Sequence, residues 1–261
     1  MSDILDELSA SALARVESGY YEIAEEEGSP GATSFTEKIG NGNSGSIIGE
    51  IKPGSPTRGK IFTGNFDPVE LGNSYLSGGV AGFSVLTDPD HFFGSLENLS
   101  LVAKLGGPTL MKDFVVGFTQ IEAARSSGAD AVLFIQRLFA RDIPSFPLEE
   151  GISYAHDLGL EVLLETNDLY EYEFALETDA DMIGINNRDL RSLEVDLSTT
   201  EKVLSEAGKD RITWSMSGIS GRSDVAFLKS AGADAFLVGT ALARAENPER
   251  FLGELGGEPD G

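Results

Sequence analysis

The sequence predicts a (β/α)₈ TIM barrel, in which eight parallel strands close into a barrel inside a ring of helices. Short runs rich in Val, Ile, Leu and Phe recur roughly every 20 to 35 residues, and segments with apolar residues at helical spacing lie between them. Strands that alternate with helices are joined by right-handed crossovers and form parallel sheets. Eight strands favour a closed barrel, and an open doubly wound sheet is the alternative.

Eight apolar runs are predicted as strands, and most have the continuous hydrophobic character of strands buried on both faces. They span residues 46–52, 81–87, 109–114, 131–136, 161–166, 182–187, 211–216 and 235–240. Helical spacing is clearest over residues 119–127, 148–158, 169–178 and 222–231. Gly128 and Gly232 each precede Ala-Asp, a pattern typical of a glycine that ends a helix before a turn into the next strand.

The segments outside the predicted barrel have a different character. Residues 4–24 have an apolar face at helical spacing and predict an extra N-terminal helix that caps the barrel. Residues 28–45 are rich in Gly, Ser, Thr and Asn, which favours a flexible connection. We expect one domain over residues 1–261, with the barrel at 46–255 and a frayed tail at 256–261.

The composition is strongly acidic and poor in lysine. Acidic residues outnumber basic ones by 43 to 19, only eight of the basic residues are lysine, and the formal net charge is -24. Phosphate backbones and anionic membranes attract basic surfaces, so the charge argues against nucleic-acid and membrane partners. The 15 phenylalanines and many apolar runs argue against disorder. An acidic surface on a folded core favours halophilic adaptation.

Cysteine is absent, which excludes disulfides, thiolate zinc sites and a cysteine nucleophile. No apolar stretch approaches the roughly 18 residues expected of a membrane span, and the first residues lack the basic and apolar regions of a signal peptide. We therefore expect a cytoplasmic protein. For its oligomeric state we expect a monomer.

His91 and His156 are the only histidines, too few for a histidine-rich metal centre. No cluster of aspartates points to a magnesium site, and neither the P-loop nor the dinucleotide fingerprint occurs. We expect acid-base chemistry that needs no metal and no cofactor.

Polar residues gather at the predicted carboxyl ends of the strands, where barrels of this type place their active sites. They are Glu50, Lys52, Lys112, Glu165, Asn186, Arg188, Ser215, Ser217, Gly239 and Thr240. Singly, each has a simpler interpretation: a lysine can extend from a strand end to solvent, a glutamate can form a structural ion pair, and an asparagine can close a turn. Together, in a chain with so few lysines, they favour an enzyme.

Two glycine-containing loops add a preference for phosphate. The sequence Ser-Gly-Ile-Ser-Gly occupies residues 217–221 after the seventh strand, and Gly239-Thr240 follows the eighth. The loops after strands seven and eight hold a phosphate in many barrels, because backbone N-H groups converge there. Ordinary strand-to-helix turns are the alternative for either loop alone. Both together predict a small phosphorylated substrate.

Five short motifs occur in order along the chain. They are Glu50-Ile51-Lys52-Pro53-Gly54-Ser55-Pro56-Thr57, Ser84-Val85-Leu86-Thr87-Asp88 with Phe92 and Gly94-Ser95, Leu110-Met111-Lys112-Asp113-Phe114 with Gln120, Gly184-Ile185-Asn186-Asn187-Arg188-Asp189-Leu190, and Ser217-Gly218-Ile219. In this order they resemble the indole-3-glycerol phosphate synthase family of tryptophan biosynthesis. The resemblance extends from the first strand to the last.

The resemblance implies a decarboxylating lyase that closes the ring of 1-(2-carboxyphenylamino)-1-deoxyribulose 5-phosphate with loss of CO₂ and water. The residues that match its catalytic set are Lys112, Glu165, Lys52, Glu50, Asn186 and Ser217. In that match Lys112 is the general acid for ring closure, and Lys52 and Glu165 form an acid and base pair for dehydration. Glu50 holds a lysine, and the last two residues of the set orient the substrate.

The resemblance also implies which residues bind the substrate. Those matching substrate-binding positions are Ser55, Phe92, Phe114, Leu133, Arg188 and Leu190, and those matching phosphate-binding positions are Gly218, Gly239 and Thr240. The apolar members would line a pocket for the aromatic ring, whereas Arg188 would meet a substrate anion. Taken alone, the apolar residues could equally belong to the core.

Two positions depart from the family pattern. Met216 stands where the family usually has glutamate, and Gly54 stands where a lysine often precedes Ser-Pro. Each removes a charge, which leaves open a weakened barrel that only binds a phosphorylated ligand or a pathway partner. Phosphoribosylanthranilate isomerase, another phosphate-binding barrel, is a further alternative, but it normally uses a cysteine base.

The acidic composition leads to a prediction about salt. At molar salt the Debye length falls to about 3 Å, which screens the repulsion between surface carboxylates. We expect the circular dichroism spectrum and cooperative thermal unfolding of the native state only in molar KCl or NaCl. A native spectrum with cooperative unfolding in dilute buffer would contradict halophilic adaptation.

Overall fold

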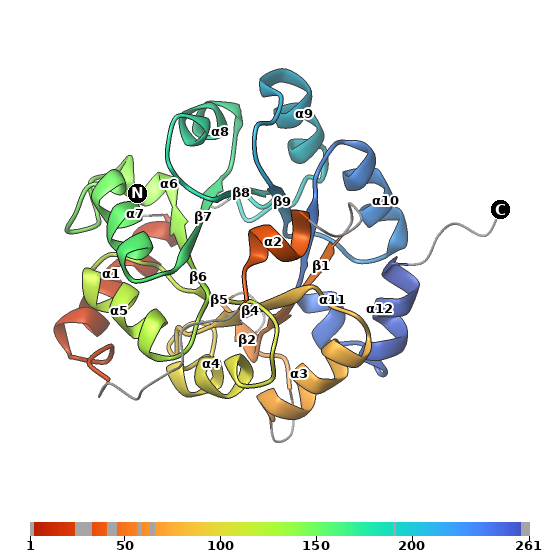
Figure 1. Cartoon of the computed structure of the whole chain (residues 1–261), viewed down its shortest axis with the longest axis horizontal. Coiled ribbons are helices and arrows are strands. Elements are labelled where there is room, and N and C mark those ends of the chain that lie inside the picture. Colours follow the sequence, from red (N-terminus) through yellow and green to blue (C-terminus); the bar gives the residue numbers. More distant parts are fainter. Residues whose placement is uncertain are drawn as a thin grey trace.

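A computed structural model describes residues 3–23, 33–40, 46–56, 59–62, 66–189 and 192–256. Eight parallel strands form a closed barrel in the order β1, β10, β9, β8, β7, β6, β5, β4 (Figure 1). They are β1 (Ser46–Ile51), β4 (Gly82–Leu86), β5 (Thr109–Lys112), β6 (Ala131–Ile135), β7 (Glu161–Thr166), β8 (Met182–Asn186), β9 (Thr213–Met216) and β10 (Ala235–Val238). The predicted barrel is confirmed.

Alternation of side chains along the strands produces two apolar layers. In β7, Leu163 packs inside the barrel, whereas Val162 and Leu164 pack against the surrounding helices. The interior layer is filled by large side chains such as Trp214, which is fully buried. Because both faces of every strand are covered, the strands are apolar almost throughout, and this is why their positions could be predicted.

Helices between the strands cover the outside of the barrel (Figure 1). They are α3 (Pro68–Ser77), α4 (Leu96–Ala103), α5 (Phe118–Ser126), α6 (Gln136–Phe139), α7 (Leu148–Asp157), α8 (Leu169–Leu176), α9 (Ser198–Ala207), α10 (Arg222–Ser230), α11 (Thr240–Ala243) and α12 (Pro248–Gly256). Side chains of Asp67, Ser95 and Asp168 cap α3, α4 and α8 by accepting hydrogen bonds from first-turn N-H groups. Among the described residues, no helix combines the length and apolar character needed to cross a membrane.

Several predicted strand ends need correction. Gln136 begins α6, and Thr240 begins α11, so neither residue belongs to a strand. The strand predicted from residue 211 begins at Thr213. Arg211 instead turns its guanidinium to the carbonyls of Leu176, Thr178 and Ala180, at the end of α8 and in the turn that follows.

The N-terminal helix is confirmed as α1 (Ile4–Glu17), which is shorter than the predicted span of 4–24. Its end is set by Ser18 at the C-cap and by Gly19, which adopts a φ of 77°. Residue 24 lies outside the described part of the chain. Side chains of α1 reach residues that follow β4 and β5, so the helix covers part of the carboxyl-end rim of the barrel.

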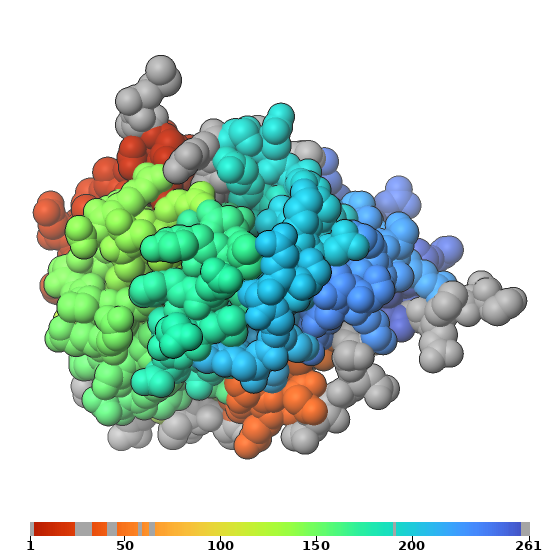
Figure 2. Space-filling model, turned by 90° about the horizontal axis from the view of Figure 1, so that it is seen from above, coloured from red at the N-terminus to blue at the C-terminus, as the bar shows by residue number. Residues whose placement is uncertain are grey.

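A second helix, α2 (Phe35–Gly40), lies within the stretch predicted as a connection. Its Phe35 ring packs edge to face on Trp214 inside the barrel, with the centroids 5.1 Å apart. In Figure 2, α1 in red and α2 in orange lie at opposite ends of the molecule. This helix contains only two apolar residues, which is too few for a periodic pattern to predict it. Its position is set by contacts with residues distant in sequence. A further unpredicted element is the hairpin of β2 (Gly54–Ser55) and β3 (Gly59–Lys60).

Glu161, at the start of β7, fixes α2 across the amino-end rim. Its carboxylate accepts hydrogen bonds from the Ser34 hydroxyl and the Phe35 N-H, both at 2.7 Å. Thr36 donates through its N-H at 3.2 Å and also through its hydroxyl. One side chain thus satisfies donors at the beginning of the helix that closes the barrel.

Replacing this carboxylate should loosen the helix from the barrel. We expect Glu161→Ala to lower the free energy of unfolding by about 3 kcal/mol, since several charge-assisted hydrogen bonds are lost together. Urea unfolding in molar KCl measures the change. Glu206→Ala, at an exposed position of α9, is the matched control and should change stability little. Equal losses in the two variants would contradict the role of Glu161.

Candidate active site

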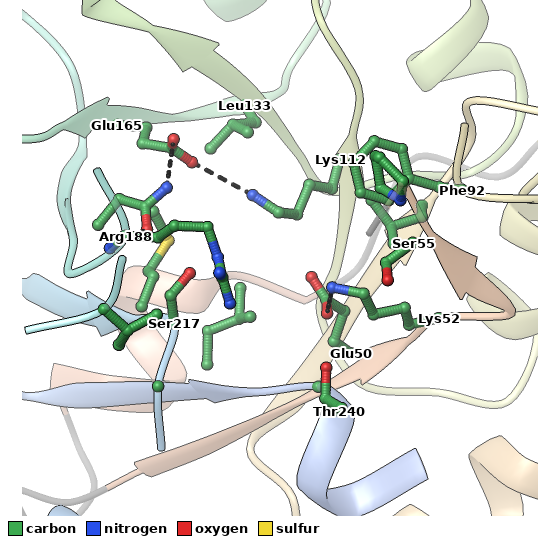
Figure 3. A pocket seen from close by; sticks show the side chains of 18 of the residues that line it. Glu50, Lys52, Ser55, Phe92, Lys112, Leu133, Glu165, Arg188, Ser217 and Thr240 are labelled. Atoms are coloured by element: carbon green, nitrogen blue, oxygen red, sulfur yellow. Dashed lines mark hydrogen bonds and ion pairs between the residues drawn. The ribbon is translucent and has the colours of Figure 1, made fainter. Parts of the chain in front are cut away.

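A cavity of about 540 Å³ opens at the carboxyl ends of the strands. Every residue that the sequence predicted for the site lines this cavity, except Ser215, which is fully buried, and Leu190, which lies outside the described residues. The lining members of that set are Glu50, Lys52, Ser55, Phe92, Lys112, Phe114, Leu133, Glu165, Asn186, Arg188, Ser217, Gly218, Gly239 and Thr240. The volume suits a small-molecule ligand. Figure 3 shows the side chains converging from several strands.

Glu50 and Lys52 form one ion pair at the wall of the cavity, with Lys52 Nζ 3.1 Å from Glu50 Oε2 (Figure 3). The side chain of Glu50 is 4% exposed and that of Lys52 is 16% exposed, so water screens the pair little. Gly239 leaves the space that Glu50 occupies, because a Cβ atom at 239 would overlap Glu50 Oε2. The end of β10 therefore shapes the ion pair at the end of β1.

Lys112 and Glu165 form a second ion pair, with Lys112 Nζ 3.2 Å from Glu165 Oε2. The other carboxylate oxygen of Glu165 accepts a hydrogen bond of 2.8 Å from the Asn186 side chain. Asn186 in turn accepts the backbone N-H of Arg188 at 3.0 Å. A chain of contacts thus runs from β5 through β7 to the end of β8, as the dashed lines of Figure 3 show in part. It fixes an ammonium group and a carboxylate side by side in the cavity.

One side of the cavity is apolar. Phe92 and Phe114 lie with ring centroids 6.2 Å apart, and Leu133 is buried beside them in the lining. The Lys52 ammonium lies 5.8 Å from the centroid of Phe92. Ile4 and Leu8 of α1 also line the cavity. Sequence reasoning missed these two because they belong to a helix outside the barrel motifs.

The loops after β9 and β10 form the part of the cavity predicted to receive phosphate. Ser217 and Gly218 adopt φ values of 66° and 88°, in the left-handed region that favours glycine. A Cβ atom at 218 would overlap Val195 Cγ1, so only glycine fits the close approach of the two loops. Strained backbone at Ser217 fits a site residue held by its surroundings. Arg244 also lines this part of the cavity and was not predicted.

Asn187 holds these loops in place. Its side-chain amide donates to Ser215 Oγ at 2.9 Å, to the Met216 carbonyl at 3.0 Å and to the Ser217 carbonyl at 3.2 Å. Its oxygen accepts the hydroxyl of Thr200 at 2.8 Å. The side chain is buried, so its hydrogen bonds are not exchanged with water. Ser215, predicted at a strand end, belongs to this buried network and does not line the cavity.

The two histidines lie apart. His91 lies between Asp88 and Glu7, at 3.4 and 3.6 Å, and His156 pairs with Asp181 at 2.9 Å on the surface. Within the described ranges, no three His, Cys, Asp or Glu side chains gather in a way that could hold a metal ion.

The family model described as "Indole-3-glycerol phosphate synthase" matches residues 5–255. The chain belongs to the indole-3-glycerol phosphate synthase family. A relative of that name from Campylobacter fetus subsp. fetus is 40% identical over 217 residues, covering 83% of this chain and 82% of the relative. Another, from Methanocaldococcus jannaschii, is 41% identical over 202 residues, covering 77% and 74%.

Solved structures share the fold of this indole-3-glycerol phosphate synthase family member at low sequence identity. Thiamine phosphate pyrophosphorylase from Pyrococcus furiosus aligns with a TM-score of 0.60 and 17% identity, over 82% of this chain and 94% of that one. N-acetylmannosamine-6-phosphate 2-epimerase from Clostridium perfringens aligns with a TM-score of 0.59 and 11% identity, over 80% and 91%. At these identities the likeness supports the fold alone.

The two departures from the indole-3-glycerol phosphate synthase pattern have local packing explanations. At Gly54 a Cβ atom would overlap the Phe93 ring and lie 2.8 Å from the Gly59 carbonyl oxygen, so no lysine fits there. Met216 is 1% exposed, and its Cε would lie 2.8 Å from a Cβ atom built at Gly184. The thioether thus fills the space above a glycine, where it contributes apolar lining in place of a charge.

The network around Asn187 leads to a stability prediction. We expect Asn187→Ala to lower the free energy of unfolding by about 3 kcal/mol or more, because buried carbonyls and the Thr200 hydroxyl lose their partner. Urea unfolding in molar KCl measures the loss. Asn73→Ala, at an exposed position of α3, is the control and should change stability by less than about 0.5 kcal/mol. A similar change in both variants would contradict the role given to Asn187.

Proposed function

We propose that the chain converts 1-(2-carboxyphenylamino)-1-deoxyribulose 5-phosphate to indole-3-glycerol phosphate, as a carboxy-lyase of tryptophan biosynthesis. The observation that carries the proposal is the presence of two lysine-carboxylate pairs, Lys52 with Glu50 and Lys112 with Glu165, in one cavity. Ring closure, decarboxylation and dehydration each need protons placed or charge neutralised, and ammonium and carboxylate groups can do both.

Lys112 acts as the general acid of ring closure. Attack of the aromatic ring on the ketose carbonyl develops negative charge on the carbonyl oxygen, which a nearby ammonium neutralises and protonates. Loss of CO₂ then restores the aromatic ring. The presence of Lys112 in the same cavity lining as Phe92, Phe114 and Leu133 supports this role, because the cavity then holds both an ammonium group and an apolar part that suits an aromatic ring.

Lys52 and Glu165 serve the dehydration that follows. An acid protonates the departing hydroxyl, and a base removes a proton from the neighbouring carbon, which leaves the double bond of the indole ring. Glu50 holds Lys52 at 3.1 Å, and Asn186 orients Glu165 at 2.8 Å. Ser217 orients the substrate from the loop after β9. These fixed contacts support the assignment of Lys52 and Glu165 as acid and base, because groups that are already positioned need little rearrangement to react.

The remaining site residues bind the substrate. Phe92, Phe114 and Leu133 surround the aromatic ring, and Ser55 contributes a hydroxyl to the lining. Leu190, which was also expected here, lies outside the described residues. Arg188 meets a substrate anion, and its guanidinium is held by the Leu193 carbonyl at 2.8 Å. The phosphate binds at Gly218, Gly239 and Thr240, which line the cavity after β9 and β10.

We further propose that the protein is halophilic, cytoplasmic and monomeric, a single domain that binds neither nucleic acid nor membranes. The formal charge of -24 supports salt adaptation and weighs against polyanionic partners. High salt would also weaken the repulsion between this acidic protein and its anionic substrate, which carries a carboxylate and a phosphate.

The proposal is tested by turnover. The anthranilate-derived ribulose phosphate is supplied in molar KCl, and indole fluorescence reports the product. We expect turnover by the natural chain and a fall in kcat of about 10² or more in Lys112→Ala, the usual scale for a positioned general acid. Lys104→Ala, exposed at the end of α4, should keep its kcat. Absence of product would favour a barrel that only binds, and an active Lys112→Ala would exclude Lys112 as the acid.

A further inference from the structure

A buried charge network joins α1 to the catalytic rim. Arg15 of α1 lies 2.9 Å from Asp90, 3.2 Å from Asp113 and 3.4 Å from Asp88. Its Nε donates to the Tyr21 hydroxyl at 3.1 Å, which donates to Asp113 at 2.8 Å. One arginine from outside the barrel motifs thus meets carboxylates that follow β4 and β5.

The part of the network formed by Arg15, Asp88 and Asp113 is almost closed to water, whereas the Asp90 side chain is 54% exposed. Arg15 is 6% exposed, Asp113 3% and Asp88 0%. Burial raises the pKa of Asp113, although Arg15 and the hydroxyl of Thr87 oppose the shift. Burial alone would lower the pKa of Arg15, but Asp113, Tyr21 and Asp88 raise it above its ordinary value. Two buried carboxylates therefore depend on one guanidinium for their charge balance.

Both carboxylates are built into the wall of the active site. Asp113 directly follows Lys112, and its Oδ1 also accepts the N-H of Phe114 at 2.8 Å. Asp88 accepts the N-H groups of Asp90 and His91, which shapes the turn that carries Phe92. Asp88 and Asp113 both line the cavity. A displacement of Asp88 and Asp113 would therefore move Lys112 and the aromatic side of the cavity together.

We infer that Arg15 is a positioning residue of the active site, which holds Lys112 and the turn of Phe92 through its contacts with Asp113 and Asp88. It does not touch the reacting atoms. The inference rests on the proposed function for the role of Lys112, whereas the placement of Lys112 by Arg15 can be measured without turnover.

The chain offers a matched control in Arg141, which follows α6 and contacts the beginning of α1. Arg141 also attaches α1 to the barrel, with ion pairs of 2.6 Å to Asp3 and Asp6. It does not line the cavity. Loss of Arg141 loosens α1 without removing charge from the wall behind Lys112. Comparison of Arg15→Met with Arg141→Met therefore separates helix attachment from positioning.

The test measures kinetics and the state of Lys112 in parallel. We expect Arg15→Met to lower kcat by about tenfold or more with KM changed less, since small displacements of a catalytic group are costly. Arg15→Lys should recover part of the loss because it restores a cation. Tyr21→Phe removes the hydroxyl that accepts from Arg15 and donates to Asp113 but leaves the ion pairs in place, so a smaller fall in kcat is expected and folding should be kept. Arg141→Met should retain kcat even where it lowers the melting temperature.

A second readout is independent of activity. In protein labelled with ¹³C-lysine, the Lys112 signal is assigned by its loss in Lys112→Arg. We expect its chemical shift to change in Arg15→Met and Tyr21→Phe, and to stay unchanged in Arg141→Met. An unchanged Lys112 signal in both Arg15→Met and Tyr21→Phe would overturn the inference. Altered signals without turnover in the natural chain would keep the inference and reject the proposed function.

Discussion

Closure of the barrel is the constraint on which the site depends, and the contact of Lys112 with Glu165 shows why. The two residues are separated by 53 positions in sequence and lie on β5 and β7, with β6 between them. Only a curved, closed sheet points the ends of such strands into one cavity. The same closure joins β1 to β10 and brings Gly239 against Glu50, which shapes the space in which Glu50 pairs with Lys52.

The net negative charge of the chain lies outside the two lysine-carboxylate pairs of the cavity. Each lysine of the two ion pairs in the cavity faces a carboxylate, so the pairs themselves carry little net charge, while the whole chain carries -24. A phosphorylated substrate therefore approaches against a repulsive field, and the cavity lining offers it Arg188 and the two paired ammonium groups. Salt screens the field over long distances far more than it screens buried contacts. Salt adaptation of the surface is thus compatible with unchanged chemistry in the cavity.

Much of the fold and of the site could be predicted from sequence because each relies on local patterns. Continuous apolar runs located all eight barrel strands, and polar residues at their ends located Lys52, Lys112 and Glu165 in one cavity. What could not be predicted depends on pairs distant in sequence. Arg15 and Asp113 are 98 positions apart, and α2 is fixed by Glu161, more than 120 residues further along. The hydrophobic periodicity of a sequence does not indicate which distant residues will become partners in the folded chain.

The departures from the family pattern show how one site can lose charges without losing its architecture. Gly54 is required where Phe93 packs on the β2–β3 hairpin, and Lys60 lies opposite Gly54 with its ammonium 5.5 Å from the Phe93 ring. A ring and a surface lysine thus occupy the region from which the family's lysine is missing. Met216 pairs in register with Asn186, next to the carboxylate of Glu165. An acid at 216 would place a second negative charge near Glu165. Two carboxylates that lie close together compete for one proton. With methionine there, Glu165 remains the carboxylate that Asn186 and Lys112 both hold.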